Sequence, residues 1–482
     1  MRATKCTGGK KKTARIARWA AGILGAGLAA GLIAGCKMGP NYKRPDVATP
    51  SSFRNFTANP QEQAQTASYA DLPWWQVFQD PVLQQLIRTA LKQNYDLQTA
   101  TERITAARAQ LTVTRSSLFP QVQGQSDFSG GKEPNFQTKS NIFTLTADAS
   151  FQLDLFGKLR RETEAARAEV LATEAARQTV VLTLVSDVAS DYFELLQLDL
   201  QLQIAKDTVK TQQDAVKLTK LRVSHGVATK LDVLEAEQVL DTANAQVPDL
   251  ERQIGQEENA ISILLGNYPQ DVPRGRLLAE QPLPPEVPPG MPSSLLERRP
   301  DIREAEENLI ATNAEIGVAK ASFFPQISLT DSGGGAFGRS SAFTSMMSSQ
   351  TTIWSYGVNV TQPVFTGGAL TGNLRLAESQ HRQELIAYEQ SIQYAFRDVS
   401  DALIGYQKNH DVRVQQEIAV KDLQDSVDTS LERYRGGITN YLEVLDGQRS
   451  LFTAELTLAE ARGNEYQSLV QLYKALGGGW QE

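Results

Sequence analysis

The sequence repeats itself, and the repeat covers most of the chain. Residues 96–122 align without gaps with residues 301–327, and the segment that begins at Arg222 aligns in the same way with the one that begins at Arg433. Because the spacing stays nearly constant throughout, the chain contains two copies of one structural design. A proline-rich segment at residues 282–292 joins the copies, and such a segment is extended and semi-rigid.

Each copy begins with a predicted helix, at residues 94–117 or 299–322, that stops at a Phe-Pro pair because proline disfavours helix in the residue before it. Two predicted strands follow, separated by glycine- and serine-rich loops at residues 129–141 and 331–351. The clearest strand covers residues 143–155, where alternation of apolar and polar residues predicts one apolar and one polar face. The other strands are predicted at residues 119–128, 323–330 and 354–361.

Very long helices follow the strands. Residues 158–225 contain neither glycine nor proline, and a helix of that length would extend on the order of 100 Å. Each long helix reverses at a glycine, Gly226 or Gly437, which predicts antiparallel hairpins. These helices are too polar to cross lipid but suit coiled-coil packing. The remaining long helices are predicted at residues 229–265, with an interruption at Pro248, and at residues 369–434 and 440–476.

The N-terminus is typical of a bacterial lipoprotein signal peptide. Residues 1–35 hold seven basic side chains and no acidic one, and they include an apolar, glycine-rich run too short for a stable membrane span. The run ends in Ile33-Ala-Gly-Cys36, which resembles a lipobox, so we expect cleavage before Cys36 and lipidation on it. An ordinary signal peptide with a chance cysteine is the alternative. Lys37 follows the cysteine where inner-membrane lipoproteins carry Asp, so resemblance implies the outer membrane.

Composition excludes several function classes. The formal net charge of −7 becomes more acidic once the basic N-terminus is removed, which argues against nucleic acid as a partner. The only cysteines are Cys6 and Cys36, so the body of the chain has no disulfide, cysteine nucleophile or zinc-cysteine site. No nucleotide-binding loop, Gly-x-Ser-x-Gly motif or metal-ligand spacing occurs. We therefore expect no enzyme activity, no metal and no cofactor beyond the covalent lipid on Cys36.

Four amphipathic strands cannot form a membrane barrel alone, because closed barrels need at least about eight strands and hydrocarbon tolerates no open sheet edge. Either the strands form a soluble sheet or several protomers share one barrel. The alternating faces and the outer-membrane address favour the shared barrel.

Particular residues also point to a known family. The run Trp74-Trp-Gln-Val-Phe78, the helix start at Asn94-Tyr-Asp-Leu97, the paired Phe-Pro-Gln segments and Gly39-Pro-Asn-Tyr42 resemble the outer membrane factor family, especially its lipoprotein branch. The resemblance covers essentially the whole mature chain. It implies a mostly α fold with a β membrane portion: long antiparallel helical hairpins plus four strands per protomer. It further implies a homotrimer whose twelve-stranded β-barrel continues into a periplasmic α-barrel.

The same resemblance implies an exit duct for small molecules or drugs, lipid-anchored in the outer membrane and extending into the periplasm. An inner-membrane pump, of the RND type, would deliver substrates through a periplasmic adaptor. Two alternatives stay open: a channel for type I protein secretion, and a lipid-anchored coiled-coil scaffold that leaves the strands unused.

These features divide the chain into consecutive segments. They are a signal peptide at 1–35, a lipidated extended segment with a short helix at 36–93, a first repeat at 94–280, a proline-rich linker at 281–298, a second repeat at 299–476 and a tail at 477–482.

The hairpin turns are the first candidate site. Glycine permits positive φ where the chain reverses, so the two glycines are predicted to set the backbone shape of the turns. The resemblance implies that these tips meet the adaptor, whereas ordinary helix termination is the alternative. The contact candidates are Arg222, Gly226, Val227, Gly437 and Ile438.

Acidic residues past each turn are the second candidate site. The resemblance implies that Glu443 and Asp446 face the threefold axis, where rings of acid would narrow the pore and attract cations. Asp232 and Glu443 also have capping-box spacing from Thr229 and Asn440, so helix capping is their alternative role. Asp446 lies one turn deeper and has no capping role, which makes it the strongest ring candidate.

Two residues just before the second turn, Tyr434 and Arg435, resemble the family's locking residues. Asp232 of the neighbouring hairpin is a plausible partner for Arg435 through a charge-assisted hydrogen bond. Some relatives carry a basic residue where this chain has Thr439, so part of the lock departs from the family pattern.

Overall fold

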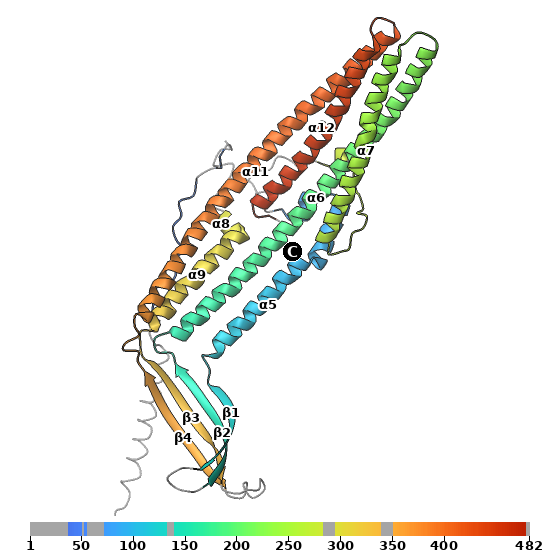
Figure 1. Cartoon of the computed structure of the whole chain (residues 1–482). Helices are drawn as coiled ribbons and strands as arrows, with labels where there is room; N and C mark the ends of the chain where they lie inside the picture. Colours follow the sequence, from blue (N-terminus) through green and yellow to red (C-terminus); the bar gives the residue numbers. More distant parts are fainter. Residues whose placement is uncertain are drawn as a thin grey trace, which may run out of the picture. The chain divides into compact units, whose positions relative to one another are not determined.

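The computed structural model describes residues 37–50, 53–54, 72–132, 139–282, 295–338 and 350–478. The expected signal peptide, Cys36, most of the proline-rich linker and the end of the tail lie outside the described residues. The elements run α3 (Trp74–Val77), α4, α5, β1, β2, α6 and α7, then α8 (Leu295–Arg298), α9, β3, β4, α11 and α12, with a 3-10 turn η2 at Leu278–Glu280 (Figure 1). Each copy therefore places a helix, two strands and two long helices in the same order.

Corresponding helices of the two copies have equal lengths. The helices before the strands, α5 (Tyr95–Ser116) and α9 (Pro300–Ala321), have 22 residues each. The first long helices, α6 (Lys158–Ser224) and α11 (Ala369–Arg435), have 67 residues each. The returning helices, α7 (Lys230–Leu264) and α12 (Tyr441–Ala475), have 35 residues each. The predicted helices and hairpins are confirmed to within about two residues at each end.

Pro248 does not interrupt α7, contrary to the prediction. It lies inside a continuous helix. Proline lacks the amide that would donate to the preceding turn and normally kinks a helix. In a 35-residue helix packed along its length, the neighbouring hydrogen bonds and the apolar contacts of Val247 and Leu250 outweigh that local loss.

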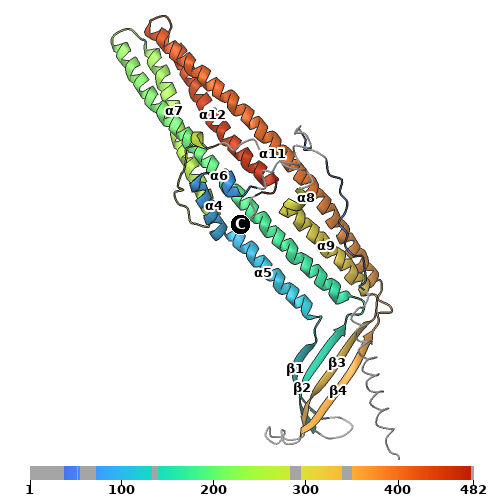
Figure 2. The same cartoon turned by 180° about the vertical axis from the view of Figure 1, so that it is seen from behind.

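The strands form one antiparallel sheet in the order β1-β2-β3-β4, which Figure 2 shows from behind. Their bounds are β1 Gln121–Lys132, β2 Lys139–Leu153, β3 Gln326–Gly338 and β4 Gln350–Thr361. The first and last strands pair on one side only within the described chain. The loops were predicted too long, because Gly333–Gly335 belongs to β3. A Cβ on Gly334 would approach the Leu145 carbonyl oxygen to 2.0 Å, so the close backbone approach explains this glycine.

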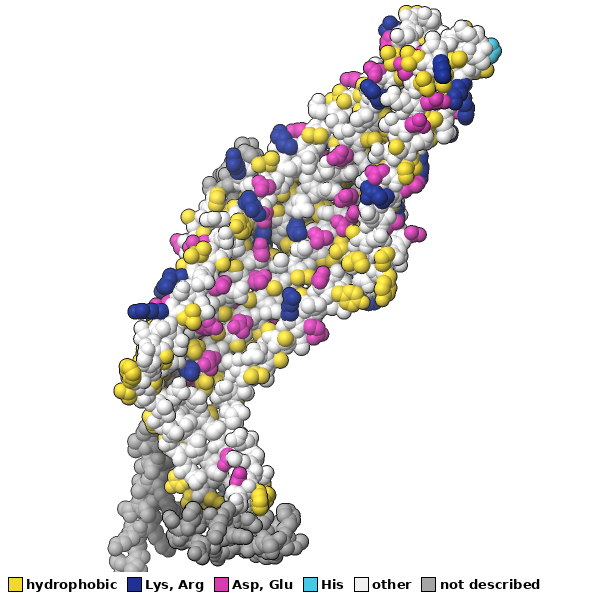
Figure 3. Space-filling view, viewed as in Figure 1, with side chains coloured by type: hydrophobic (Ala, Val, Ile, Leu, Met, Phe, Trp, Pro, Cys, Tyr) yellow, Lys and Arg dark blue, Asp and Glu magenta, His cyan; other side chains and the backbone are white. Residues whose placement is uncertain are grey.

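The strand register puts alternate residues of all four strands on a common face, since directly opposed residues point the same way. Phe151 lies opposite Leu329, which lies opposite Val358. This face is mainly apolar, although it also carries Ser126, Thr352 and Asp331, the last of which lies opposite Tyr356. The other face carries mainly Gln, Ser and Thr, so the predicted amphipathic sheet is confirmed. On the face drawn in Figure 3, charged side chains of both signs cover the helices, and few lie on the strands.

The chain forms two compact units, each built from both copies of the repeat. One unit contains residues 1–45, 104–172 and 305–387, and so holds the sheet; the other contains residues 46–103, 173–304 and 388–482, and so holds both hairpin turns. The second unit has the largest hydrophobic core, in which α4 (Pro81–Gln93) packs with residues of α6, α7 and α12.

A buried carboxylate organises one side of this core. Asp80 caps α4 by accepting from the Val82 amide at 2.8 Å, and it also accepts from the Tyr192 hydroxyl at 3.0 Å and from Gln281 Nε2 at 2.7 Å. Burial alone would raise the pKa of Asp80, but these hydrogen bonds outweigh burial and hold the pKa below its ordinary value. The segment around Gln281 is thereby fixed to the start of α4.

None of the helices in the described segments has the length and hydropathy of a membrane-spanning helix. The described residues likewise contain no group of three or more His, Cys, Asp or Glu side chains arranged to hold a metal ion.

Candidate functional site

Both long hairpins reverse through the same backbone motif. At the end of α6 the Gly226 amide donates to the Val223 carbonyl at 2.9 Å, and the Val227 amide donates to the Arg222 carbonyl at 3.0 Å. The end of α11 has the same pair of bonds. This Schellman arrangement requires a left-handed residue after the helix. Gly226 and Gly437 supply it with φ of 75° and 71°, so the predicted glycine reversals are confirmed.

The residues that follow these glycines expose large apolar side chains. Val227 is 64% exposed and Ile438 is 73% exposed. The two turns lie side by side in both cartoon views (Figures 1 and 2). The tips therefore present a small apolar surface beside the hydrogen-bonded helix ends, which suits contact with another protein.

The capping role considered for Asp232 is confirmed. Thr229 precedes α7 and accepts from the Asp232 amide at 3.3 Å, while the Asp232 carboxylate accepts from the Thr229 amide at 2.7 Å. These reciprocal bonds form a capping box and satisfy two amide groups at the helix start.

Glu443 has a mixed role. Asn440 caps α12 by accepting from the Glu443 amide at 3.3 Å. The Glu443 carboxylate, however, accepts from the Thr439 hydroxyl and pairs with Arg433 at 3.3 Å. The capping box is therefore only half formed, and this acid ties the start of α12 to the end of α11.

Asp446 lies past the capping turn, as predicted. Its side chain is 68% exposed, and it pairs with Arg449 at 3.1 Å on the same helix. Such a solvent-exposed pair contributes little stability. Asp446 therefore contributes little to the stability of the single chain, and its place in an acid ring stays a prediction.

Two residues predicted for different roles meet between the hairpins. The guanidinium of Arg222, on α6, lies 4.3 Å from the ring centroid of Tyr434, on α11. Tyr434 is only 9% exposed and packs against the Tyr441 ring at 4.9 Å. Burial raises the pKa of Tyr434; Arg222 opposes this shift and Asp232 adds to it. The cation–π contact joins the two hairpins, so Arg222 packs inward beside the exposed tip.

No hydrogen bond or ion pair joins Arg435 to Asp232 in the described part of the chain, where the Asp232 carboxylate is occupied at Thr229. The Arg435 lock therefore stays a prediction. Sequence reasoning missed Tyr441 and Arg433. Tyr441 begins α12 as an apolar residue directly after a cap, which is the signal that could have revealed it.

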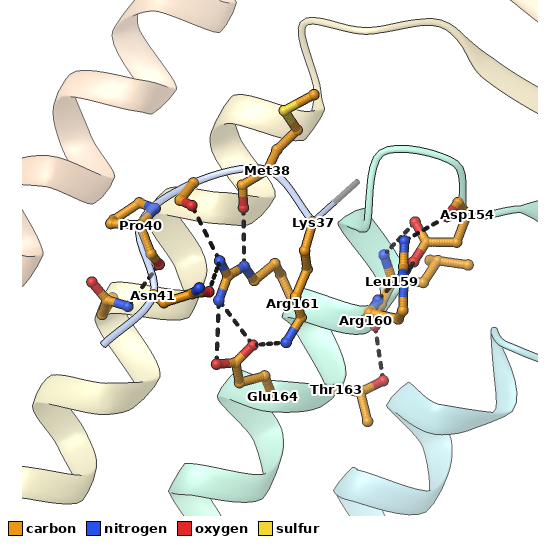
Figure 4. A network of polar contacts seen from close by, with 12 residues as sticks. Lys37, Met38, Pro40, Asn41, Asp154, Leu159, Arg160, Arg161, Thr163 and Glu164 are labelled. Atoms are coloured by element: carbon orange, nitrogen blue, oxygen red, sulfur yellow. Dashed lines mark hydrogen bonds and ion pairs between the residues drawn. The ribbon is translucent and has the colours of Figure 1, made fainter. Parts of the chain in front are cut away.

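A second polar site holds the segment that follows Cys36 (Figure 4). Arg161, near the start of α6, has no exposed side-chain surface, and it donates to the Met38 carbonyl at 3.0 Å and to Asn41 Oδ1 at 2.9 Å. Glu164 balances its charge at 3.0 Å and also pairs with Lys37 at 2.5 Å. We call this set of contacts the clasp.

The clasped segment continues along α9. The Asn313 side chain donates to the Pro40 carbonyl at 3.1 Å, and Glu306 pairs with Arg44 at 2.9 Å. At Gly317 a Cβ would come within 2.8 Å of both Arg161 and the Met38 carbonyl. Only glycine allows this approach, so the surface is shaped to fit the segment.

Replacing Arg161 by Met should lower the free energy of unfolding by about 3 kcal/mol, because it removes a fully buried guanidinium that donates to the Met38 carbonyl and to Asn41 Oδ1, and leaves Glu164 with Lys37 as its remaining partner in the clasp. Chemical unfolding of the purified full-length protein in detergent measures this. Arg167→Met, on an exposed face of the same helix, is the control and should change stability by less than about 0.5 kcal/mol. Equal stability of both variants would show that the clasp is incidental.

Paired helical hairpins, joined to a sheet with one apolar and one polar face, define a subunit of a membrane channel. Known proteins with similar sequences and structures belong to this class. A family model described as "Outer membrane efflux protein" matches residues 86–267 and 291–478. The chain is 34% identical to the cation efflux system protein CusC of Escherichia coli O6:H1, over 93% of this chain and 97% of that protein.

The probable outer membrane lipoprotein SilC of Salmonella typhimurium is also 34% identical, over 94% of this chain and 97% of that protein. The open-state structure of the Neisseria gonorrhoeae outer membrane channel MtrE has a TM-score of 0.84 and 31% identity, over 92% of this chain and 99% of that one. The chain therefore belongs to the outer membrane efflux protein family. It is an outer-membrane efflux duct and not an enzyme.

Proposed function

We propose that three copies of this chain assemble into the exit duct of a tripartite efflux system that an RND-type pump drives. The observation that carries the proposal is the sheet, whose mainly apolar face extends over all four strands while β1 and β4 each keep one edge unpaired in the described chain. A membrane interior tolerates no unpaired edge, so other strands must cover both. Three copies would supply twelve strands, within the range of known membrane barrels.

The mixed polar surfaces of the long hairpins suit a water-filled continuation of this barrel into the periplasm. At their tips, Val227 and Ile438 would meet the periplasmic adaptor, and Asp446 with Glu443 would line the narrow end. The relative CusC is named for cation efflux, and another relative, TtgC of Pseudomonas putida, is named for toluene efflux. These names support small molecules or ions as the cargo.

Conductance tests this function directly. Purified protein in a planar lipid bilayer should give discrete channels, and its gene should restore efflux to cells lacking their own outer-membrane duct. A type I secretion channel would conduct but restore protein export instead, whereas a scaffold would not conduct. Absence of conductance from correctly assembled trimers would refute the duct.

Lipidation of Cys36 is the part of the proposal that concerns anchoring. Lys37, the next residue, is fixed by Glu164, so acyl chains on Cys36 would start one residue from the clasp. Cys36→Ser should abolish labelling by radioactive fatty acid, and Lys37→Ala is the matched control that should keep the label. Exported Cys36→Ser protein should retain partial efflux, because the shared barrel also holds the membrane. An unmodified Cys36 in the intact mass of the wild-type protein would contradict this assignment.

A further inference from the structure

Two aromatic side chains at the junction between the sheet and the long helices are left uncovered. Phe119 precedes β1 and is 55% exposed; Phe365 follows β4 and is 91% exposed. Neither ring contacts another aromatic ring in the described chain. Both belong to the unit that holds the sheet. Their place matters more than their exposure, because each ring adjoins an edge strand that pairs on one side only within the described chain.

The internal repeat shows what such a partner looks like. Phe119 aligns with Phe324, because each belongs to the Phe-Pro pair that precedes the first strand of its copy. Phe365 corresponds to Phe156, because each lies between the second strand of its copy and the long helix. Phe156 and Phe324 stack on each other, with ring centroids 4.7 Å apart and planes 18° apart.

This stack lies where the two copies of the repeat meet. Strand β2, which ends before Phe156, pairs with β3, which begins after Phe324, and the last pair in the ladder is Leu153 with Ile327. The stack therefore closes the end of the seam between β2 and β3. By the same repeat, a second seam should join β4 to β1. These strands lie at opposite edges of the four-stranded sheet, so one chain cannot pair them.

We infer that Phe365 of one protomer stacks on Phe119 of the next and closes the end of a β4–β1 seam, as Phe156 and Phe324 do within the chain. The inference rests on the proposed trimer and specifies its contact. The partner that covers each exposed ring is a second copy of this chain. A closed trimer would then alternate three stacks within chains and three between chains.

The faces of the edge strands are compatible with this seam. On β4 the apolar face carries Tyr356 and Val358, and on β1 it carries Val122 and Phe128. Pairing that follows the β2–β3 seam joins residues of matching faces, so the apolar surface continues from one protomer to the next.

Cross-linking in native membranes tests the contact. Phe119→Cys and Phe365→Cys would be made in separate, differently tagged full-length copies, co-expressed and treated with a short bis-maleimide. Cys6 and Cys36 are the only natural cysteines, and the first leaves with the signal peptide while the second is acylated in the proposed form. We expect a product that carries both tags. The control pair Phe156→Cys with Phe324→Cys in one chain should give a link within that chain and no product with both tags.

Amine-reactive cross-linking of the same membranes reports the trimer independently. If trimers form and the control pair reacts, but no thiol link joins Phe119→Cys to Phe365→Cys, the inference is overturned. The proposed duct would then stay intact, and lipid would be the neighbour of Phe365. Wild-type membranes without trimers would overturn the duct as well.

If the cysteine variants fail to assemble, Phe365→Tyr and Phe365→Ala test the stack through trimer formation. Trimers in the Tyr variant but not in the Ala variant support the stack, whereas equal trimer formation in both variants refutes it.

Discussion

Replacing both Gly226 and Gly437 by valine should abolish efflux while trimers still form in the outer membrane. Both residues have positive φ, which costs a non-glycine residue roughly 1–2 kcal/mol and a β-branched one more. An added Cβ meets nothing within 4 Å at either position, so the cost comes from the backbone and not from a clash. The turns should then reshape, displacing Val227 and Ile438 without disturbing the distant core.

Minimum inhibitory concentrations of a known pump substrate would measure the loss, which should reach the level of cells without the duct. Gly255→Val is the control, because Gly255 lies within α7 in open space and has no positive φ. Cross-linking to the adaptor should fall in parallel. Normal adaptor cross-linking in the double variant would remove the tips from the proposed interface.

The fold was largely predictable because its signals are local and occur twice. Uninterrupted helical sequence gave the length of α6, and Gly226 marked its end. The sheet was harder to predict at its hairpin ends. Gly333–Gly335 has the composition of a loop, yet it pairs with β2, and at Gly334 the β2 backbone approaches too closely for a side chain. That requirement comes from neighbouring strands and is not visible in the segment itself.

In the candidate site, too, local features could be predicted from the sequence and contacts between distant residues could not. Capping by Asp232 follows from a three-residue spacing and was anticipated. The contact of Arg222 with Tyr434 joins residues far apart in sequence, on helices whose relative rotation only packing decides. The clasp at Arg161 has a similar origin, since a buried arginine that binds main-chain carbonyls leaves no sequence motif.

The acid ring at Glu443 and Asp446 and the locking residues Tyr434 and Arg435 would together form a gate at the narrow end of the duct, and replacing them should change the electrical properties of the channel. Arg435→Ser combined with Tyr434→Phe should raise the resting conductance in a planar bilayer. Tyr434 is buried against Tyr441 beneath Arg222, so the Phe replacement keeps the packing and removes only the hydroxyl. A rise in conductance would then report a lost polar contact and not a collapsed tip. Unchanged conductance would leave Tyr434 as a packing residue and Arg435 as a solvated side chain.

The acid ring is tested by removing the negative and the positive member of its exposed ion pair in separate variants. Asp446→Asn should lower the cation-to-anion permeability ratio by roughly threefold or more, because it removes three carboxylates from the narrow end and leaves the paired Arg449 groups uncompensated. Arg449→Met should shift the ratio the other way. Asp214→Asn is a matched control, since Asp214 forms the same kind of exposed pair with Lys217 at 2.9 Å and stands elsewhere on the hairpins. If all three variants keep the wild-type ratio, Asp446 is a solvated surface acid and the selectivity of the duct arises elsewhere. If Asp446→Asn and Arg449→Met move it in opposite directions while Asp214→Asn does not, the field at the pore axis comes from this turn of α12.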